Sequence, residues 1–310
     1  MRRIVLWNIG LLVALIVVLS AKIVLASCGS ANCFLVTGTQ EGIASTGQIV
    51  IDLSYRWIPM DQSQEGSHPT SEGEEIRTNN ELAQFDLSYG LAERFSLALT
   101  IPFLNNRRHE HLEGTEFSNT DGTTGFGDIR LIGKYALWVS TKHLLVGGLG
   151  IKTPTGEYKL LDNNGAINEA TIQPGTGSWD GIASLYYTYQ IIPHQFDAFF
   201  STTYQANTEN PLDYRLGNIF LLNAGVSYRS LEKARISLQV NARQAPHDEF
   251  EGAKAPNTGG RWIYLTPGVT LQATPNTALY THVQLPIYQE VNEVNIVPRY
   301  GFIFGVSHVF

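Results

Sequence analysis

Tyr-Gly-Phe-Ile-Phe-Gly-Val-Ser-His-Val-Phe, residues 300–310, ends the chain and places a bulky side chain at every second position up to Phe310. Side chains of a β-strand point to opposite faces in turn, so this period of two predicts a strand with one apolar face. The same period recurs along residues 49–57, 95–103 and 235–243, and no stretch after Gln48 shows sustained helical periodicity. Counting similar segments predicts about twelve strands, beginning near residues 48, 82, 95, 126, 144, 179, 196, 214, 234, 262, 278 and 298.

The connections between the predicted strands fall into two classes that alternate along the chain. Residues 91–94, 139–143, 191–194, 230–233 and 275–277 are short turns, whereas residues 59–80, 104–124, 153–177, 206–211, 244–260 and 289–295 are longer polar stretches. Short turns at one end and long loops at the other are the plan of an outer-membrane barrel, and a β-sandwich does not sort its loops so consistently. The sequence therefore predicts an all-β fold over residues 48–310: a closed antiparallel transmembrane up-and-down β-barrel of about twelve strands, of the Gram-negative outer-membrane type.

The terminal residue and the aromatic residues favour insertion into an outer membrane. A strand that alternates up to a C-terminal Phe resembles the signal that the bacterial barrel-insertion machinery binds, which makes Phe310 the predicted insertion signal. A barrel in lipid has to be closed, because each unpaired backbone amide there costs several kcal/mol. Aromatic residues near the predicted strand ends would form interface girdles: Tyr55, Trp57, Tyr89, Tyr135, Trp138, Trp179, Tyr187 and Tyr204. We therefore expect the protein in the bacterial outer membrane, in contact with its lipid and lipopolysaccharide.

The composition agrees with strands that have one apolar and one polar face. Charged residues make up 16% of the 310 residues, below the roughly 25% of a soluble domain, as lipid-facing positions that carry no charge would require. Hydrophobic residues reach only 43%, which excludes a polytopic helical membrane protein. The formal net charge of −7 argues against a nucleic-acid partner, since proteins that bind nucleic acids are basic.

Residues 1–26 have the pattern of a secretory signal peptide. Arg2 and Arg3 precede an apolar run over residues 4–18, and Val-Leu-Ala at 24–26 suits signal peptidase. An uncleaved anchor helix is the alternative, because residues 4–26 are long enough to cross a bilayer. Cleavage would remove three bases and no acid, which would change the formal net charge from −7 to −10.

Residues 27–47 are predicted to form a periplasmic N-terminal segment that contains both cysteines of the chain, Cys28 and Cys33. Two interpretations of this pair remain open. The cysteines could close a small disulfide loop in the oxidising periplasm. Alternatively, Cys28 could be acylated, because Leu-Ala-Ser-Cys at 25–28 resembles a bacterial lipobox.

Several short motifs go beyond a generic barrel pattern. They are Gly-Phe-Gly-Asp-Ile-Arg at 125–130, Gly-Lys-Tyr at 133–135, Gly-Ile-Lys-Thr-Pro-Thr-Gly at 150–156, Gln-Pro-Gly-Thr-Gly-Ser-Trp-Asp at 173–180 and Val-Gln-Leu-Pro-Ile-Tyr-Gln at 283–289. In this order and spacing, the set resembles the outer-membrane transporter-like family named after the meta-pathway of phenol degradation. The resemblance covers about residues 49–310 and leaves out the cysteine segment. It implies a bacterial outer-membrane β-barrel that passes small, often hydrophobic molecules.

The polar face of each predicted strand would line the lumen. The candidates for this lining are Asp52, Arg56, Asp86, Asp128, Arg130, Lys134, Lys152, Asp180, Asp197, Arg215, Arg235, Arg243, His282, Gln284 and Arg299. Their mixed signs allow two compatible interpretations: a transverse field that orients polar solutes in a constriction, or an ion-pair network that fills a narrow barrel. Apolar inward positions such as Ile132, Ile182 and Phe199 favour a narrow path over an open aqueous pore.

No catalytic, cofactor or metal site is predicted. His109-Glu-His111 and residues 247–251 contain metal-ligand types in predicted loops, but no third partner lies at a known spacing. An outer-membrane lipid hydrolase is a remote alternative, because its catalysis needs a base within hydrogen-bond reach of a nucleophile. Neither His143 nor His308 lies beside a strand Ser with an obvious orienting Asn.

The sequence therefore predicts a passive channel or transporter for small molecules, with hydrophobic or aromatic solutes included. Selection among solutes would come from the charge of the lumen and the folding of the loops, and no enzymatic chemistry is expected. The alternative is a structural barrel that sheathes a periplasmic partner, such as an electron-transfer protein, docked through residues 27–47.

Overall fold

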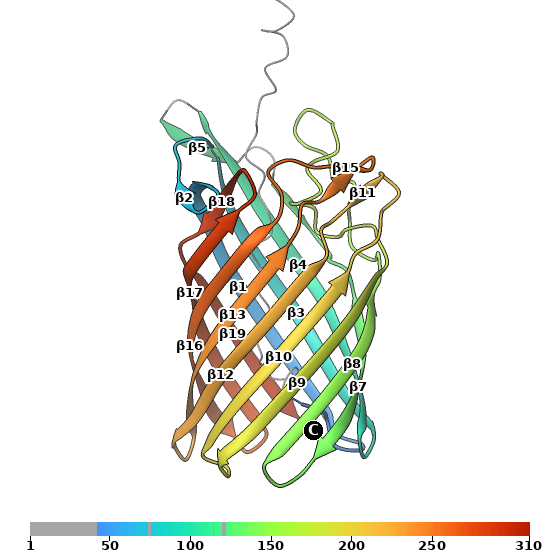
Figure 1. Cartoon of the computed structure of the whole chain (residues 1–310), viewed down its shortest axis with the longest axis vertical. Coiled ribbons are helices and arrows are strands. Elements are labelled where there is room, and N and C mark those ends of the chain that lie inside the picture. The colour runs from blue at the N-terminus through green and yellow to red at the C-terminus, as the bar shows by residue number, and fades with distance from the viewer. Residues whose placement is uncertain (1–41, 74–75, 114, 120–121) are drawn as a thin grey trace, which may run out of the picture.

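Twelve long strands, each antiparallel to its neighbours, form one closed barrel in the computed structural model (Figure 1). The structure describes residues 42–73, 76–113, 115–119 and 122–310. The barrel strands are β1 (Ile49–Glu65), β3 (Ile76–Ala92), β4 (Phe95–Glu113), β7 (Arg130–Val139), β8 (His143–Lys152), β9 (Asp180–Ile192), β10 (Phe196–Ala206), β12 (Ile219–Leu231), β13 (Ala234–Ala245), β16 (Gly260–Thr274), β17 (Thr277–Val291) and β19 (Gly301–Val309). No helix within these residues is long and apolar enough to cross a bilayer.

The first and last strands close the barrel. Ile51 on β1 pairs with Leu87 on β3 at one edge and with His308 on β19 at the other. Because β1 has a partner on both sides, the barrel wall has no free edge, as lipid requires. The predicted fold class is confirmed, and the alternating residues at the chain end form the strand that completes the wall.

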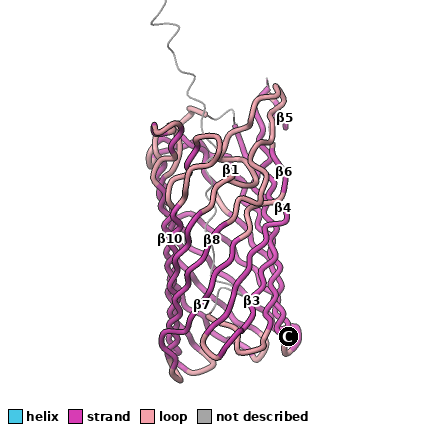
Figure 2. Tube along the Cα trace, turned by 90° about the vertical axis from the view of Figure 1, so that its right-hand side faces the viewer, coloured by secondary structure: helices cyan, strands magenta, loops and turns pink. Residues whose placement is uncertain are grey.

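Short strands are added at the end of the barrel where the long loops lie, which is the upper end in Figure 1. They are β2 (His68–Pro69), β5 (Glu116–Asn119), β6 (Thr123–Gly125), β11 (Tyr214–Arg215), β14 (Glu249–Phe250), β15 (Ala253–Lys254) and β18 (Val294–Pro298). Short turns and the C-terminus lie at the lower end, as Figure 2 shows from the side. The two predicted loop classes therefore lie at opposite ends of the barrel.

Several strands start at other residues than the sequence predicts. β3 begins six residues earlier than expected, and both β1 and β3 extend into the predicted loop 59–80. In this upper part Thr78 and Asn80 are buried while Asn79 and Glu81 are partly exposed, so both faces are polar. Apolar alternation marks a strand only where one face meets lipid, and it therefore misses the parts of strands that project beyond the membrane.

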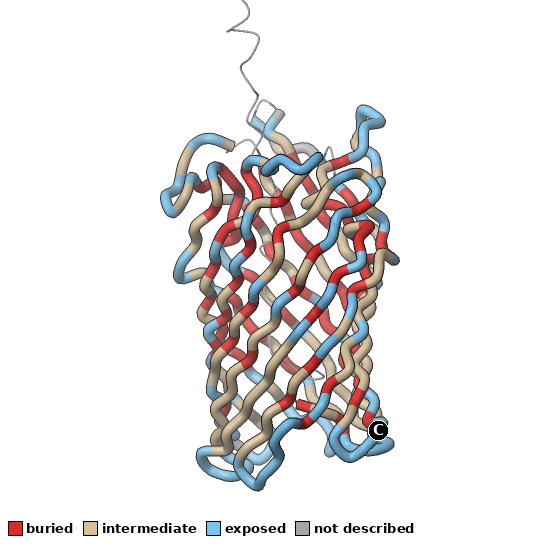
Figure 3. The backbone as a smooth tube through the Cα atoms, turned by 45° about the vertical axis from the view of Figure 1, so that its right-hand side comes forward, coloured by how far each residue is buried: buried red, intermediate tan, exposed pale blue. Residues whose placement is uncertain are grey.

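More buried and more exposed residues alternate along the barrel strands, as the colours of Figure 3 show. On β1, Asp52 and Arg56 are at most 4% exposed, whereas Leu53 and Tyr55 are 44% and 37% exposed. The inner face is rich in polar residues: Asn241, for example, is fully buried and donates its Nδ2 to Asn223 Oδ1 at 2.8 Å. An apolar outside around a polar inside is the arrangement of a transmembrane β-barrel.

Residues 42–47, the last part of the predicted periplasmic segment, run along the inner wall of the barrel near the lower end. Gly47 N donates to Gly90 O at 2.8 Å, and Ala44 is only 3% exposed. A Cβ atom on Gly90, which belongs to the inward face of β3, would lie 1.8 Å from Ser45 O. Only glycine allows this close approach, so Gly90 is the docking point of the segment.

The other predictions for the N-terminus concern residues outside the described ranges. The predicted signal peptide at 1–26, the two cysteines Cys28 and Cys33, and most of the segment 27–47 belong to this part of the chain.

A charge placed on the outer face should destabilise the barrel. Leu238 on β13 is 45% exposed and lies between Val226 of β12 and Pro267 of β16. We expect Leu238→Arg to lower the free energy of unfolding in phospholipid vesicles by about 2–4 kcal/mol, because an Arg near the midplane loses its hydration. Urea titration, with folding followed by the shift in gel migration on boiling, measures the change.

Leu161→Arg is the matched control for this prediction. Leu161 is also exposed, at 58%, but it lies in the loop that follows β8. We expect a change below about 0.5 kcal/mol there. Equal effects at the two positions would contradict a lipid-facing belt around the strands.

Candidate functional site

The connection between β8 and β9, residues 153–179, folds back into the upper end of the barrel. Ile172 in this loop is fully buried and packs in a hydrophobic cluster that includes Trp262 of β16. Asn105 of β4 donates its Nδ2 to Pro174 O at 2.8 Å. Because contacts to opposite walls hold it, the loop covers the upper lumen. We refer to residues 153–179 as the lumen loop.

A buried ion group fixes the lumen loop at both of its ends. Lys152 Nζ lies 2.9 Å from Asp128 Oδ2 and 2.6 Å from Asp180 Oδ2, and all three side chains are at most 5% exposed. Asp128 also accepts hydrogen bonds from the backbone N–H groups of Gly156 and Thr176, both at 2.9 Å. Breaking a buried pair leaves an uncompensated charge, so this group holds the loop firmly in place.

Glycines allow the two halves of the lumen loop to touch. A Cβ atom on Gly156 would lie 2.7 Å from Gly175 Cα, and one on Gly175 would lie 2.6 Å from Gly156 Cα. Each glycine belongs to one of the sequence motifs, at 150–156 and 173–180. These motifs therefore encode the fold of the loop that covers the lumen.

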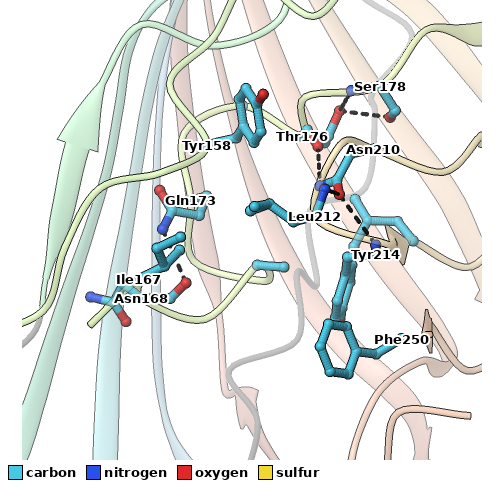
Figure 4. A pocket seen from close by; sticks show the side chains of 13 residues that line it. Tyr158, Ile167, Asn168, Gln173, Thr176, Ser178, Asn210, Leu212, Tyr214 and Phe250 are labelled. Atoms are coloured by element: carbon cyan, nitrogen blue, oxygen red, sulfur yellow. Dashed lines mark hydrogen bonds between the residues drawn. The ribbon is translucent and has the colours of Figure 1, made fainter. Parts of the chain in front are cut away.

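The lumen loop and its neighbours enclose a cavity of about 340 Å³, which we call the vestibule (Figure 4). Its apolar wall consists of Tyr158, Ile167, Ala170, Leu212, Tyr214, Leu216 and Phe250. Its polar groups come from Asn168, Gln173, Thr176, Ser178 and Asn210. A concave apolar wall with a few amide and hydroxyl groups is typical of sites that bind small molecules.

Tyr214 and Asp248 join two of the loops around the vestibule. Tyr214 Oη donates to Asp248 Oδ2 at 2.7 Å, and Gly217 N donates to Asp248 Oδ1 at 2.7 Å. Burial raises the pKa of Asp248 although these two hydrogen bonds oppose the shift. Burial also raises the pKa of Tyr214, and the Asp248 carboxylate raises it further. Tyr214 therefore stays a hydrogen-bond donor at neutral pH.

A second cavity, of about 160 Å³, adjoins the vestibule, and Gln173 and Thr176 line both of them. We call it the basic cavity, because its charged lining consists of Arg56, Arg107, Asp128, Arg130, Lys152, Arg243 and Asp248. Trp262 lines it too, and the Arg243 guanidinium carbon lies 5.0 Å from the centroid of the Trp262 ring. Arg56 of β1, Lys152 of β8 and Arg243 of β13 all line it, so side chains from different sides of the barrel converge on this cavity.

Two further cavities continue the path toward the short turns. One of about 100 Å³ shares Arg130 and Gln205 with the basic cavity, and apolar Ile132 is part of its wall. Another of about 440 Å³ reaches Lys233 and Pro275 in the turns at the lower end. The first three cavities thus adjoin one another through shared lining residues, and the fourth lies below them at the end of the short turns.

The structure places thirteen of the fifteen predicted lumen residues on the inner face of the barrel. Buried ones are Asp52, Arg56, Asp86, Asp128, Lys134, Lys152, Asp180, Arg243, His282 and Gln284. Arg130, Asp197 and Arg235 are partly buried, and Asp197 pairs with Arg235 at 3.9 Å.

The other two predicted lumen residues lie elsewhere. Arg215 belongs to the loop strand β11 and pairs with Glu249 at 2.5 Å, with both side chains about two-fifths exposed. Arg299 pairs with Asp61 at 3.2 Å, and its side chain is 60% exposed. The strict alternation that the prediction assumed does not hold in either place, because β11 lies in a loop and a bend at Arg299 separates β18 from β19.

Two features were missed by the sequence reasoning. The side chain of Trp262 points into the barrel because it lies an even number of residues from Thr266, an inward polar residue lower on β16. Following the same alternation up the strand would have predicted this inward position. His109 and Glu110, expected in a loop, lie on β4: His109 Nδ1 is 3.1 Å from Thr78 Oγ1, and Glu110 pairs with Arg77. The strand continues there above the lipid, where both faces are polar.

The two histidines weighed for lipid hydrolysis have other partners. His143 Nδ1 lies 2.8 Å from Tyr187 Oη, and its ring stacks on Trp138 at 4.5 Å. His308 Nδ1 lies 2.8 Å from Thr277 Oγ1. Both side chains therefore belong to the packing of the lower rim. Among the described residues, no three side chains of His, Cys, Asp or Glu form a group that could hold a metal ion.

Solved structures of other outer-membrane proteins resemble this barrel. The outer membrane channel COG4313 from Pseudomonas putida F1 matches with a TM-score of 0.70 at 13% identity, covering 89% of this chain and 100% of that one. The toluene transporter TodX from Pseudomonas putida matches with a TM-score of 0.43 at 10% identity, covering 91% and 95% of the two chains. A search of curated protein sequences gives no match.

The sequence itself also matches a family model. The model carries the description "Putative MetA-pathway of phenol degradation" and matches residues 73–302. This range contains every motif on which the resemblance was based, together with the lumen loop and the residues of the vestibule. The resemblance is thereby confirmed, and the chain belongs to the family of the MetA-pathway of phenol degradation.

Proposed function

We propose that the protein is a passive channel of the Gram-negative outer membrane that passes small molecules through the lumen. The observation that carries this proposal is the series of four cavities along the inside of a closed barrel with an apolar outer face. COG4313 of Pseudomonas putida, with which the chain shares its fold, is an outer membrane channel. This agreement supports the same role here.

The vestibule is the first selective point on this path. Its volume of about 340 Å³ lies at the small end of the range for ligand pockets, roughly 300–1,000 Å³, so it admits compounds of about one ring. Tyr158, Tyr214 and Phe250 give it aromatic surface, and Asn168 and Asn210 give it hydrogen-bonding groups. Solutes with an apolar body are therefore favoured over strongly hydrated ones.

The lower lumen is narrowed by the chain's own residues. Residues 42–47 dock on Gly90, and Gly42 lines the cavity of about 100 Å³ together with Lys134. The path is thus narrow along its length, which favours slow, selective passage over the bulk flow of a wide aqueous porin.

Conduction is the direct test of the proposed function. Purified, folded protein added to a planar lipid bilayer should give discrete current steps of small size, because ions follow the same cavities as solutes. Heat-denatured protein at the same concentration serves as the control and should give none. An absence of current over many confirmed insertions would contradict the channel and leave a structural barrel in its place.

Release of the lumen loop should widen the path. We expect Asp128→Ala to raise the single-channel conductance, because the loop loses two backbone hydrogen bonds to this carboxylate and Lys152 loses one partner. The same change should lower the free energy of unfolding by about 1–3 kcal/mol. Bilayer recordings and urea titration measure the two effects, and limited proteolysis reports whether the loop is released.

Asp197→Ala is the control for the loop variant. Asp197 is also an inward carboxylate, but its partner is Arg235 near the lower end of the barrel. Its replacement should leave loop proteolysis unchanged. If Asp128→Ala conducts like the wild type while its loop is cleaved faster, the loop does not restrict the path.

A further inference from the structure

The basic cavity has a charge opposite in sign to that of the whole chain. Five cationic side chains line it, against the carboxylates of Asp128 and Asp248. Asp180, which pairs with Lys152 at 2.6 Å, adds a third carboxylate, so five cations stand against three carboxylates among these residues. The chain as a whole has a formal net charge of −7.

This excess is not cancelled by the next cavity down the path. Lys134 and Asp86 line that cavity together with Arg130, so the two cavities combined have six cations against four carboxylates. A focused positive potential inside low-dielectric walls attracts anions from solution.

A hydrogen-bond donor lies beside this charge. Trp262 lines the basic cavity and is 2% exposed, and its Nε1 is buried without a hydrogen-bond partner among the described residues. The Arg243 guanidinium lies 5.0 Å from the same ring. A buried N–H without a partner costs free energy, and an acceptor atom on a bound solute would recover that cost. A donor next to a cation suits a carboxylate.

The lining of the adjoining vestibule determines which chemical groups the rest of such a solute can carry. It shares Gln173 and Thr176 with the basic cavity and presents an apolar, partly aromatic wall. A molecule that spans the two cavities would therefore have an apolar ring or short chain at one end and a negative charge at the other.

We propose that the basic cavity is a binding site for small organic carboxylates, with Arg243 and Trp262 holding the carboxylate and the vestibule holding the apolar body. The proposal rests on the proposed function for its role as the selective point of the path, but the binding itself does not require conduction. Charge-assisted hydrogen bonds are about twice as strong as neutral ones, so a neutral analogue of the same shape binds less well.

Benzoate and benzyl alcohol, which differ mainly in charge, test the site on the purified full-length barrel in detergent. Equilibrium dialysis with the radiolabelled compounds should show tighter binding of benzoate by at least about tenfold. Arg243→Gln should weaken benzoate binding by about tenfold or more and leave benzyl alcohol binding nearly unchanged. Trp262→Phe, which keeps an aromatic ring and removes the N–H, should weaken benzoate binding severalfold.

Arg261→Gln is the matched control. Arg261 precedes Trp262 on β16, but its side chain is 62% exposed and pairs with Glu290 at 3.6 Å. Its loss should leave benzoate binding unchanged, and the shift in gel migration on boiling shows that each variant is folded. Equal binding of the two compounds, or equal effects of the changes at Arg243 and Arg261, would overturn the site.

Bilayer recordings under a salt gradient separate this inference from the channel itself. Current that reverses at a potential showing preference for chloride over potassium supports the basic cavity as the selective point. Current with a preference for potassium overturns that role while the channel stands. Benzoate binding without any current overturns the channel while the carboxylate site stands.

Discussion

The need to pair every backbone amide in lipid is the constraint on which the rest of the structure depends. An open sheet would expose one row of N–H and C=O groups at each edge, at several kcal/mol for each group. β1 removes both edges by pairing with β3 and with β19. Once the sheet is closed, every strand has one face toward lipid and one toward a small interior, and all other features of the molecule are arranged around that division.

The apolar side chains of each strand face outward, toward lipid, so the opposite, polar face of the strand forms the interior. Buried charges are costly unless they are paired and hydrogen-bonded. Lys152, Asp128 and Asp180 are paired with one another in this way. Asp128 also accepts a hydrogen bond from the lumen loop, so the same group holds the loop in place. The buried charges therefore stabilise the position of the lumen loop and also make the lining of the lumen polar.

The lumen that results has an apolar region followed by a charged region. An apolar vestibule at the long-loop end leads into a cavity with a positive balance, and residues 42–47 narrow the lumen beyond it. In the proposed channel, a solute would have to fit both an apolar and a positively charged cavity at neighbouring points, which is a stricter condition than size alone. The proposed channel would therefore admit few compounds, in keeping with a narrow barrel of twelve strands rather than a wide porin.

The strands within the membrane and their faces could be predicted from the sequence, because lipid on one side imposes a period of two on the residues themselves. Asp52, Arg56 and Gln284 were assigned to the inner face on this ground, and they are buried there. The same reasoning was wrong where lipid no longer acts: it missed the upper parts of β1 and β3, placed His109 in a loop, and assigned Arg215 and Arg299 to the lumen.

The sequence by itself determined the barrel, its approximate strand number, the two classes of loops and the family, since each can be read along the chain from alternation, connection lengths and the order of short motifs. Only the tertiary structure decided that the lumen loop turns inward, that Arg243 and Trp262 share a cavity with Arg56 and Lys152, and that residues 42–47 dock on Gly90. These contacts join residues far apart in the chain, and their positions follow from how the closed wall brings distant strands together. No local sequence pattern encodes these long-range contacts.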